Sequence, residues 1–326
     1  MVLNDLCGDV ANDLACIEKI SDSVLKGAAV SEIRQVEHFL RVTGIDAGEH
    51  QVPLSSRIYS VISSLAFELP EGRCFYCDPK LLRSSHDLSK ARFDSITSVR
   101  RETKLYETGI ALLEAGAEPE LVLVDGPLAF SNWWKEAGRD VDRALLIGAV
   151  NAFLDACERR GIPVVGIVKR PSARYLMYHL ELNGDTSLPD SYVLHHVLAT
   201  GERTEVFSPR AALRKVIRSS PFMDLIRHPV YCLYARFSRQ WDVPPIRLDF
   251  PAFSLGCLDD VVEHCYATSY IEGIPFAIVK ADEAVRVSKG FVSDIYLEAV
   301  SRVGRESGQV GSLAPMWGER SWLETN

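Results

Sequence analysis

Residues 120–128 read ELVLVDGPL, and this stretch decides the fold class. Its apolar run is short and is bounded by turn residues, which favours a buried strand. Gly126 and Pro127 then force the chain to turn. The predicted strand therefore ends on the carboxylate of Asp125. In open α/β sheets, functional groups gather just beyond the ends of the strands. Asp125 is accordingly the first candidate site residue.

Strand and helix patterns alternate on both sides of this stretch. The alternation predicts an α/β domain with parallel pairing in its middle. Two strand patterns separated by the turn signal PEG predict an antiparallel hairpin, so that the sheet is mixed. A second strand pair is expected nearer the C-terminus. The predicted elements are a short strand at VTGID, a hairpin of 57–69 with 73–77, a helix at 92–115, a strand at 120–125, a helix at 139–161, a strand at 162–169, and a strand pair of 230–237 with 246–250.

The simplest domain organisation is one α/β domain with helical additions at both ends. Residues 1–42 are expected to form an N-terminal helical segment, because apolar residues recur there at spacings of three and four. The main domain then covers 43–305 and includes C-terminal helices from LDDVVEHCY onward. Residues 306–326 are expected to be a tail.

The composition limits how this chain can meet other molecules. Its net charge is −8 and its pI about 5.6, whereas a protein that holds nucleic acid by charge alone is usually basic. Binding to DNA therefore requires a local basic patch, metal ions or a basic partner. The N-terminus carries acids and lacks the apolar core of an export signal, and eight scattered cysteines suggest reduced thiols. We therefore expect a cytoplasmic protein. The longest apolar stretch is too short to cross a membrane.

A second aspartate has the same setting as Asp125. Asp46 closes the predicted strand in TGIDAG and is followed by small residues. Two carboxylates at the ends of neighbouring strands would repel each other and raise each other's pKa, and a divalent cation removes that repulsion. Oxygen ligands suit Mg²⁺ or Mn²⁺. The alternative for either residue alone is an aspartate that caps a turn.

The helix at 92–115 offers two further acids. On a helical wheel, Glu102 lies at the centre of the apolar stripe, one turn before Leu105 and Tyr106, and Glu107 lies about 140° away, towards solvent. A glutamate in an apolar face costs several kcal/mol unless it is paired or binds metal. Glu102 is therefore the preferred third ligand. It could instead be a first-turn acid favoured by the helix dipole, or be neutralised by the neighbouring arginines.

Basic residues lie at another predicted strand end. The stretch IVKRPSARYL places Lys169, Arg170 and Arg174 there. Three carboxylates around a metal are typical of two-metal phosphoryl transfer, and these cations could hold the phosphates beside it. The alternative is a solvated cluster of loop charges.

These motifs occur in an order that resembles the NurA nuclease family. They are GIDAG, RRETKLYE, ELVLVDGPL, VVGIVKRPSARYL, GERT, VPPIRLDFP and EGIPFAIVKAD, and the likeness runs from about residue 43 to 290. The resemblance implies an RNase H-like core and a manganese-dependent (or Mg²⁺-dependent) DNA nuclease that cuts by attack of a metal-activated water on the phosphodiester. It also implies a ring-shaped homodimer and a hexameric HerA-like ATPase partner, which feeds DNA into the nuclease during end resection and repair.

The resemblance also assigns residues. Asp46 and Asp125 match the family's metal-binding aspartates, and the acid of the preceding helix falls at Glu102 or Glu107. Near the C-terminus the family commonly has Ala-His, whereas this chain has Ala281-Asp282. Asp282 is still a competent ligand, but the departure leaves an alternative open: a catalytically weakened or inactive subunit that binds and regulates the HerA-like ATPase.

Overall fold

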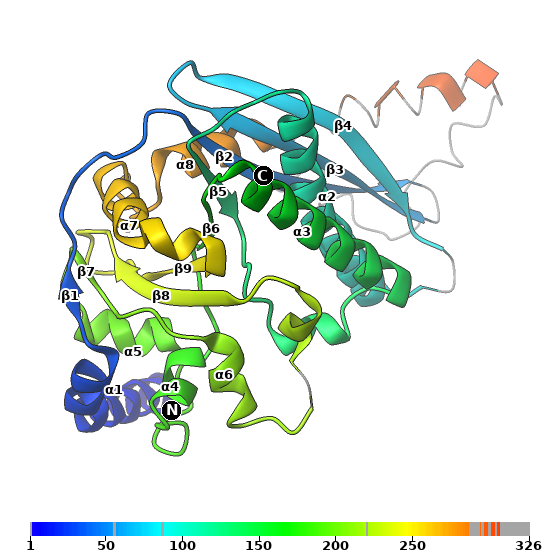
Figure 1. The fold of residues 1–326 in the computed structure, drawn as a ribbon. Coiled ribbons are helices and arrows are strands. Elements are labelled where there is room, and N and C mark those ends of the chain that lie inside the picture. The colour runs from blue at the N-terminus through cyan, green and yellow to red at the C-terminus, as the bar shows by residue number, and fades with distance from the viewer. Residues whose placement is uncertain are drawn as a thin grey trace.

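The computed structural model describes residues 2–54, 57–85, 88–219 and 221–286, together with 294, 297, 298, 301–303, 305 and 306. In this part of the chain, nine strands form a single sheet in the order β1-β7-β8-β9-β6-β5-β2-β3-β4 (Figure 1). Helices cover both faces of the sheet. The expected fold, an RNase H-like mixed α/β sheet flanked by helices, is therefore confirmed.

The strands are β1 (Ser31–Glu32), β2 (Val42–Leu54), β3 (Arg57–Glu68), β4 (Arg73–Arg83), β5 (Leu121–Asp125), β6 (Val164–Val168), β7 (Glu202–Arg203), β8 (Val230–Arg236) and β9 (Ile246–Pro251). Within the described part of residues 2–286, the α-helices are α1 (Val2–Ala28), α2 (Lys90–Glu114), α3 (Asp140–Arg160), α4 (Tyr175–His179), α5 (Asp190–Val197), α6 (Pro209–Arg214), α7 (Leu258–Ala267) and α8 (Phe276–Val285), and short 3₁₀ helices lie at Asn132–Lys135, Phe222–Leu225 and Ala252–Cys257.

The central elements follow the sequence patterns closely. The strands β3 and β4 form the expected antiparallel hairpin, and β5 pairs in parallel with both β2 and β6. The later pair, β8 with β9, is antiparallel as expected. Gly161 ends α3 in a left-handed conformation with a φ of 66°, which glycine adopts without steric cost.

The strand that carries Asp46 is longer than expected. We expected it to end at Asp46, but β2 runs on to Leu54, because β3 pairs with it in antiparallel fashion along its whole length. Only the pairing of β2 with β5 stops here, since its last aligned pair is Ile45 with Val124. Asp46 therefore lies inside a strand, at the point where its parallel neighbour ends.

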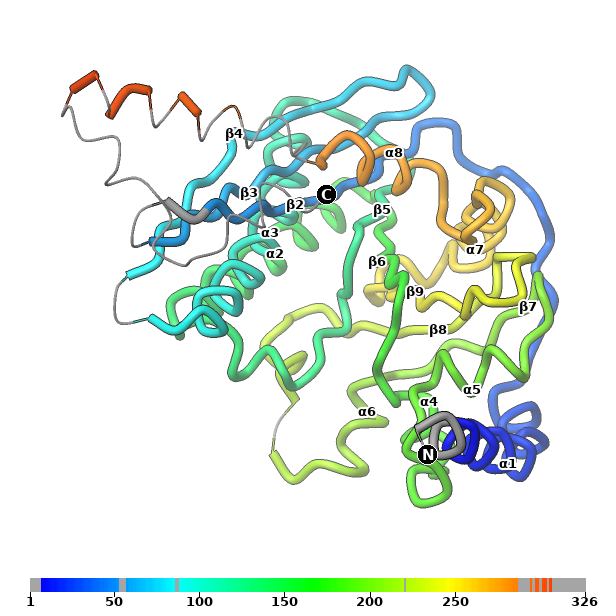
Figure 2. The backbone as a smooth tube through the Cα atoms, turned by 180° about the vertical axis from the view of Figure 1, so that it is seen from behind, coloured from blue at the N-terminus to red at the C-terminus, as the bar shows by residue number. Residues whose placement is uncertain are grey.

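Strand alternation sorts the core into two layers. Side chains of β5 at Val122 and Val124 belong to the large core that includes residues of α2 and α3, whereas Leu121 and Leu123 belong to the second core that includes residues of α7 and α8. Successive residues of a strand point to opposite faces, so Asp125 points to the face that α7 and α8 cover. Figures 1 and 2 show α2 and α3 side by side on the other face.

The two ends of the chain differ from the sequence expectation. The helix α1 ends at Ala28 rather than near residue 42, and Ala29 has a positive φ of 46°. The following chain is extended and pairs through β1 with β7, which interrupts the helix. At the other end, a loop separates α7 from α8, and most of the helix and tail expected beyond residue 286 lie outside the described residues. Among the described helices, none combines the length and apolarity that a membrane span requires.

Candidate functional site

Strand register brings Asp46 and Asp125 side by side. The parallel pairing of β2 with β5 aligns Ile45 with Val124, so each aspartate is the next residue on its own strand. The side chains of Val42 and Leu123 belong to the α7 and α8 core layer, and the two aspartates follow them at even spacings. Both carboxylates therefore project from the same face of the sheet.

The helix α8 packs against this face of the sheet at close range. A Cβ atom at Gly44 would lie 2.3 Å from the carbonyl oxygen of Ala277, and one at Gly48 would lie 3.2 Å from that of Val285. Four strand residues span about 13 Å and eight helical residues about 12 Å, so α8 runs alongside β2 between these two contacts. The two glycines of GIDAG thus admit the helix that carries Asp282.

Asp282 completes a group of three carboxylates with Asp46 and Asp125. One oxygen from each lies within 4.8 Å of the other two, which makes this a candidate metal site among the described residues. The group opens into a cavity of about 290 Å³. The cavity is lined by Asp46, Ala47, Gly48, Arg101, Glu102, Leu105, Asp125, Asp282, Val285 and Arg286.

Burial and mutual repulsion change the acidity of the first two aspartates. Burial, followed by the nearby charge of Asp125, raises the pKa of Asp46 to about 8. Burial also raises the pKa of Asp125, and the ammonium of Lys169 opposes that rise. Buried acids with such raised pKa values are common at functional sites.

Lys169 is the basic residue that the structure brings to the carboxylates. Its Nζ donates to Asp125 Oδ2 at 2.6 Å and lies 3.8 Å from Asp282 Oδ1. Burial by itself would lower the pKa of Lys169, but these carboxylates raise it above its ordinary value. Lys169 is therefore charged and partly neutralises the acidic group.

The two glutamates of α2 have different surroundings. Glu102 is only 5% exposed and lines the cavity, whereas Glu107 is half-buried and does not line it. Oε1 of Glu102 is buried without a hydrogen-bond partner, and a Cβ at Gly126 would lie 2.8 Å from it. Burial raises the pKa of Glu102 to about 7. Glu102 lies outside the 4.8 Å group but lines the same cavity as the three aspartates.

The remaining basic residues divide between the cavity and the surface. Arg170 is exposed beyond the end of β6, and Arg174 donates to the carbonyl oxygens of Asn183 and Thr186, away from the carboxylates. Arg101 and Arg286 line the cavity instead. Arg286 could have been found from its spacing, because it lies four residues after Asp282, and the structure shows an ion pair between the two side chains.

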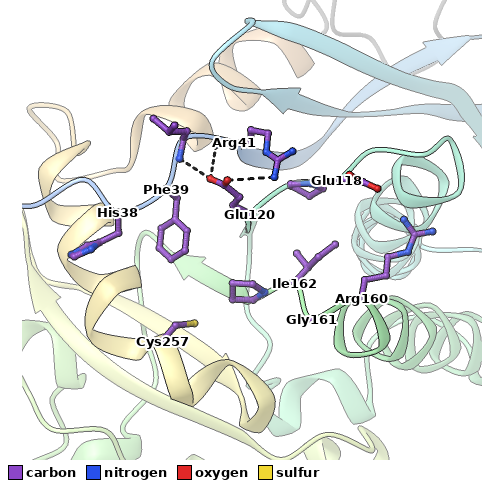
Figure 3. Close-up of a pocket in the computed structure, with 12 residues that line it drawn as sticks. His38, Phe39, Arg41, Glu118, Glu120, Arg160, Gly161, Ile162 and Cys257 are labelled. Carbon is purple, nitrogen blue, oxygen red and sulfur yellow. Dashed lines mark hydrogen bonds and ion pairs between the residues drawn. The ribbon is translucent and has the colours of Figure 1, made fainter.

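A larger cavity, of about 970 Å³, lies beside the N-terminal ends of the central strands (Figure 3). It is lined by residues that precede β2, β5 and β6, including Arg41 and Ile162. There the carboxylate of Glu120 accepts hydrogen bonds from the backbone N–H groups of Leu40 and Arg41. Glu120 is thus already paired, and the described residues of this cavity contain no group of three acids like that around Asp125. The smaller cavity is the better candidate site.

The residues around Asp125 fit a divalent metal ion. The acidic residues among them offer carboxylate oxygens, the ligand type that Mg²⁺ and Mn²⁺ prefer. Three carboxylates lie within 4.8 Å of one another, and a buried oxygen of Glu102 lacks a protein partner. A bound cation would relieve the repulsion and satisfy that oxygen. Asp46, Asp125, Asp282 and Glu102 are therefore the residues that would hold it.

Three solved structures resemble this chain in fold. The crystal structure of the NurA nuclease from Sulfolobus solfataricus is 16% identical, with a TM-score of 0.63, over 94% of this chain and 98% of that one. A structure of NurA with manganese is 10% identical, with a TM-score of 0.59, over 93% and 98%. A third, of NurA bound to dAMP and manganese, is 10% identical, with a TM-score of 0.53, over 88% and 92%. These likenesses establish the fold.

No curated protein sequence matches the chain significantly. The NurA domain profile, however, matches residues 40–287, which is most of the chain. That range begins just before β2 and ends just after α8, so it contains every residue of the carboxylate group. The protein therefore belongs to the NurA family.

Proposed function

We propose that this protein is a metal-dependent deoxyribonuclease that hydrolyses the phosphodiester bond, with Mn²⁺ or Mg²⁺ as its cofactor. The observation that carries the proposal is the group of Asp46, Asp125 and Asp282, whose oxygens lie within 4.8 Å of one another. The manganese and dAMP in solved NurA structures support the choice of metal and of substrate class.

Each residue of the site has a proposed task. Asp46, Asp125 and Asp282 would hold the metal, and the bound ion would supply positive charge beside the phosphate and lower the pKa of water. Glu102 lines the same cavity with a buried oxygen that has no protein hydrogen-bond partner, so it would complete the ligand set. Lys169, Arg101 and Arg286 place positive charge beside the carboxylates and favour a bound phosphate.

The position of Asp282 bears on the alternative of an inactive subunit. The family's histidine is replaced here, but the replacement still places an oxygen donor among the carboxylates. The substitution therefore keeps a ligand at this place, which favours an active enzyme. Arg286 forms an ion pair with Asp282, so the carboxylate of Asp282 would have to bind both Arg286 and the metal.

Cleavage assays test the proposed activity. The parental protein is expected to degrade linear single- or double-stranded DNA with Mn²⁺ and to lose this activity in EDTA. Asp46→Ala and Asp125→Ala are expected to lower the rate by at least about 100-fold, because each removes a metal ligand. Asp242→Ala is the matched control, since Asp242 is exposed on the β8–β9 loop. Parental rates in either site variant would refute the assignment.

The same assay separates related activities. Cleavage of RNA but not of DNA would indicate a ribonuclease of the same fold. Absence of cleavage with either substrate, together with stimulation of a HerA-like ATPase, would support the regulatory subunit instead.

We also propose a homodimer that works with a HerA-like hexameric ATPase in DNA end processing. This part of the proposal is supported by the family resemblance. Sedimentation of the protein alone and mixed with the ATPase tests both associations. A monomer that neither binds the ATPase nor changes its rate would contradict them.

A further inference from the structure

The turn after Asp125 is held from several sides. Gly126 has a φ of 153°, and its N–H donates to the carbonyl oxygen of Ile167 on β6 at 3.1 Å. A Cβ at Gly166 would lie 2.7 Å from the carbonyl oxygen of Gly126. Glycine at both positions therefore lets the turn lie directly against β6, and small shifts of the turn would move Asp125.

Asp249 holds the far side of this turn. Its Oδ2 accepts hydrogen bonds from the N–H groups of Leu128 at 3.0 Å and Ala129 at 2.9 Å. Arg247 donates to both of its oxygens, at 2.7 and 3.0 Å, and both side chains are buried. Both residues of this ion pair belong to the motif VPPIRLDFP, and neither is one of the three aspartates of the candidate metal site.

Tyr106 links the turn to the helix that carries Glu102. Its hydroxyl donates to the carbonyl oxygen of Pro127 at 2.8 Å. Tyr106 lies one helical turn after Glu102 on α2, so both side chains project from the same face. This hydrogen bond therefore joins the helix that carries Glu102 to the turn that follows Asp125.

We propose that Tyr106 and Asp249 are positioning residues that hold Asp125 and Glu102 in register for metal binding. The inference rests on the proposed function. Metal ligation requires donor atoms to be placed within a few tenths of an ångström, and groups that orient ligands typically contribute about 10- to 100-fold to metal affinity. Neither residue touches the metal or the substrate in this role.

The variant Tyr106→Phe tests the proposal most directly. It removes the hydroxyl but keeps the ring that packs against Phe130 and Phe153. Calorimetric titration with Mn²⁺ is expected to give a dissociation constant about 10-fold higher than that of the parent. The DNA cleavage rate is expected to recover at high Mn²⁺ concentration. Asp249→Asn, titrated well below its unfolding temperature, is expected to show a loss of the same kind.

Tyr234→Phe is the matched control. The hydroxyl of Tyr234 donates to the buried carboxylate of Asp190 at 2.7 Å, so its loss also removes one buried hydrogen bond. This variant is expected to lose thermal stability and to keep the parental Mn²⁺ affinity. Parental affinity in folded Tyr106→Phe and Asp249→Asn would overturn the positioning role. A parental protein that binds no Mn²⁺ would instead overturn the proposed function.

Discussion

At the scale of the residue, the site contains two carboxylic acids whose pKa values are unusually high. The pKa of Asp46 is raised to about 8 and that of Glu102 to about 7, in each case mainly by burial. Both values exceed those of the unfolded chain, so the folded protein keeps protons that the unfolded chain releases. Metal binding has to displace those protons, because only the carboxylate form is a good ligand.

The raised pKa of Asp46 predicts that Mn²⁺ affinity depends on pH. Between pH 6 and pH 8 the apparent affinity is expected to rise by up to about 10-fold per pH unit for each proton displaced, and to level off above the pKa. Calorimetric titrations across this range, in buffers of different ionisation enthalpy, measure both the affinity and the protons released. An affinity that is constant from pH 6 to pH 8 would contradict the raised pKa.

The two glutamates of α2 supply a matched pair of variants. Glu102→Gln removes the charge of a buried group that lines the cavity, whereas Glu107→Gln changes a half-buried residue that does not line it. Glu102→Gln is expected to lower the Mn²⁺-dependent cleavage rate by about 10- to 100-fold. Glu107→Gln is expected to leave the cleavage rate within about 2-fold of the parental rate, since substitutions away from a site or a core have little effect. The opposite order would assign the role to Glu107.

At the scale of the element, the seating of α8 on β2 decides where Asp282 lies. The backbone of α8 comes so close to Gly44 that a Cβ there would lie 2.3 Å from a carbonyl oxygen. Backbone atoms cannot rotate away as a flexible side chain can, so a larger residue would displace the whole helix. The helix carries Asp282, and its displacement would open the carboxylate group.

Gly44→Ala is therefore expected to act on stability and on metal binding together. It should lower the free energy of unfolding by about 1–3 kcal/mol, as overpacking typically does, and weaken Mn²⁺ binding. Gly148→Ala is the control, because Gly148 is exposed in the middle of α3 and a Cβ there meets nothing within 4 Å. That variant should gain about 0.5–1 kcal/mol. Urea unfolding and Mn²⁺ titration measure both quantities, and parental behaviour of Gly44→Ala would contradict the tight seating.

At the scale of the whole molecule, the site collects negative charge in a chain that is already acidic. The net charge is −8, and three carboxylates crowd within 4.8 Å at the end of the parallel strands. Binding of a divalent cation should consequently stabilise the folded protein, because the unfolded chain does not hold the three carboxylates together.

Addition of Mn²⁺ is thus expected to raise the melting temperature of the parental protein. At a free concentration of 100 times the dissociation constant, the stabilisation is about 2.7 kcal/mol, or about 4 °C. Asp125→Ala is expected to show less than half of this shift, whereas Asp242→Ala should show all of it. Calorimetric scans in EDTA and in Mn²⁺ provide the comparison. An equal shift in all three proteins would place the ion elsewhere.

Local patterns determined the kinds of element and much of their order. The apolar run before Asp125, the helix ended by Gly161 and the hairpin around PEG were predicted from the sequence, and the structure confirms them. They are predictable because strand and helix periodicity, and the turn preferences of glycine and proline, act over a few neighbouring residues. The helical wheel also predicted that Glu102, and not Glu107, lies on the buried face of its helix, and Glu102 is indeed buried. This prediction succeeded because helical periodicity is likewise a local property.

Tertiary structure alone decided how these pieces meet. It extended β2 past Asp46, seated α8 on Gly44 and Gly48, and directed Lys169 towards Asp125. Strand register and helix docking depend on packing between segments far apart in the chain, which no local pattern records. The sequence by itself thus determined which acids and bases are present and on which elements they lie, and only the packed fold decided which of them share one cavity.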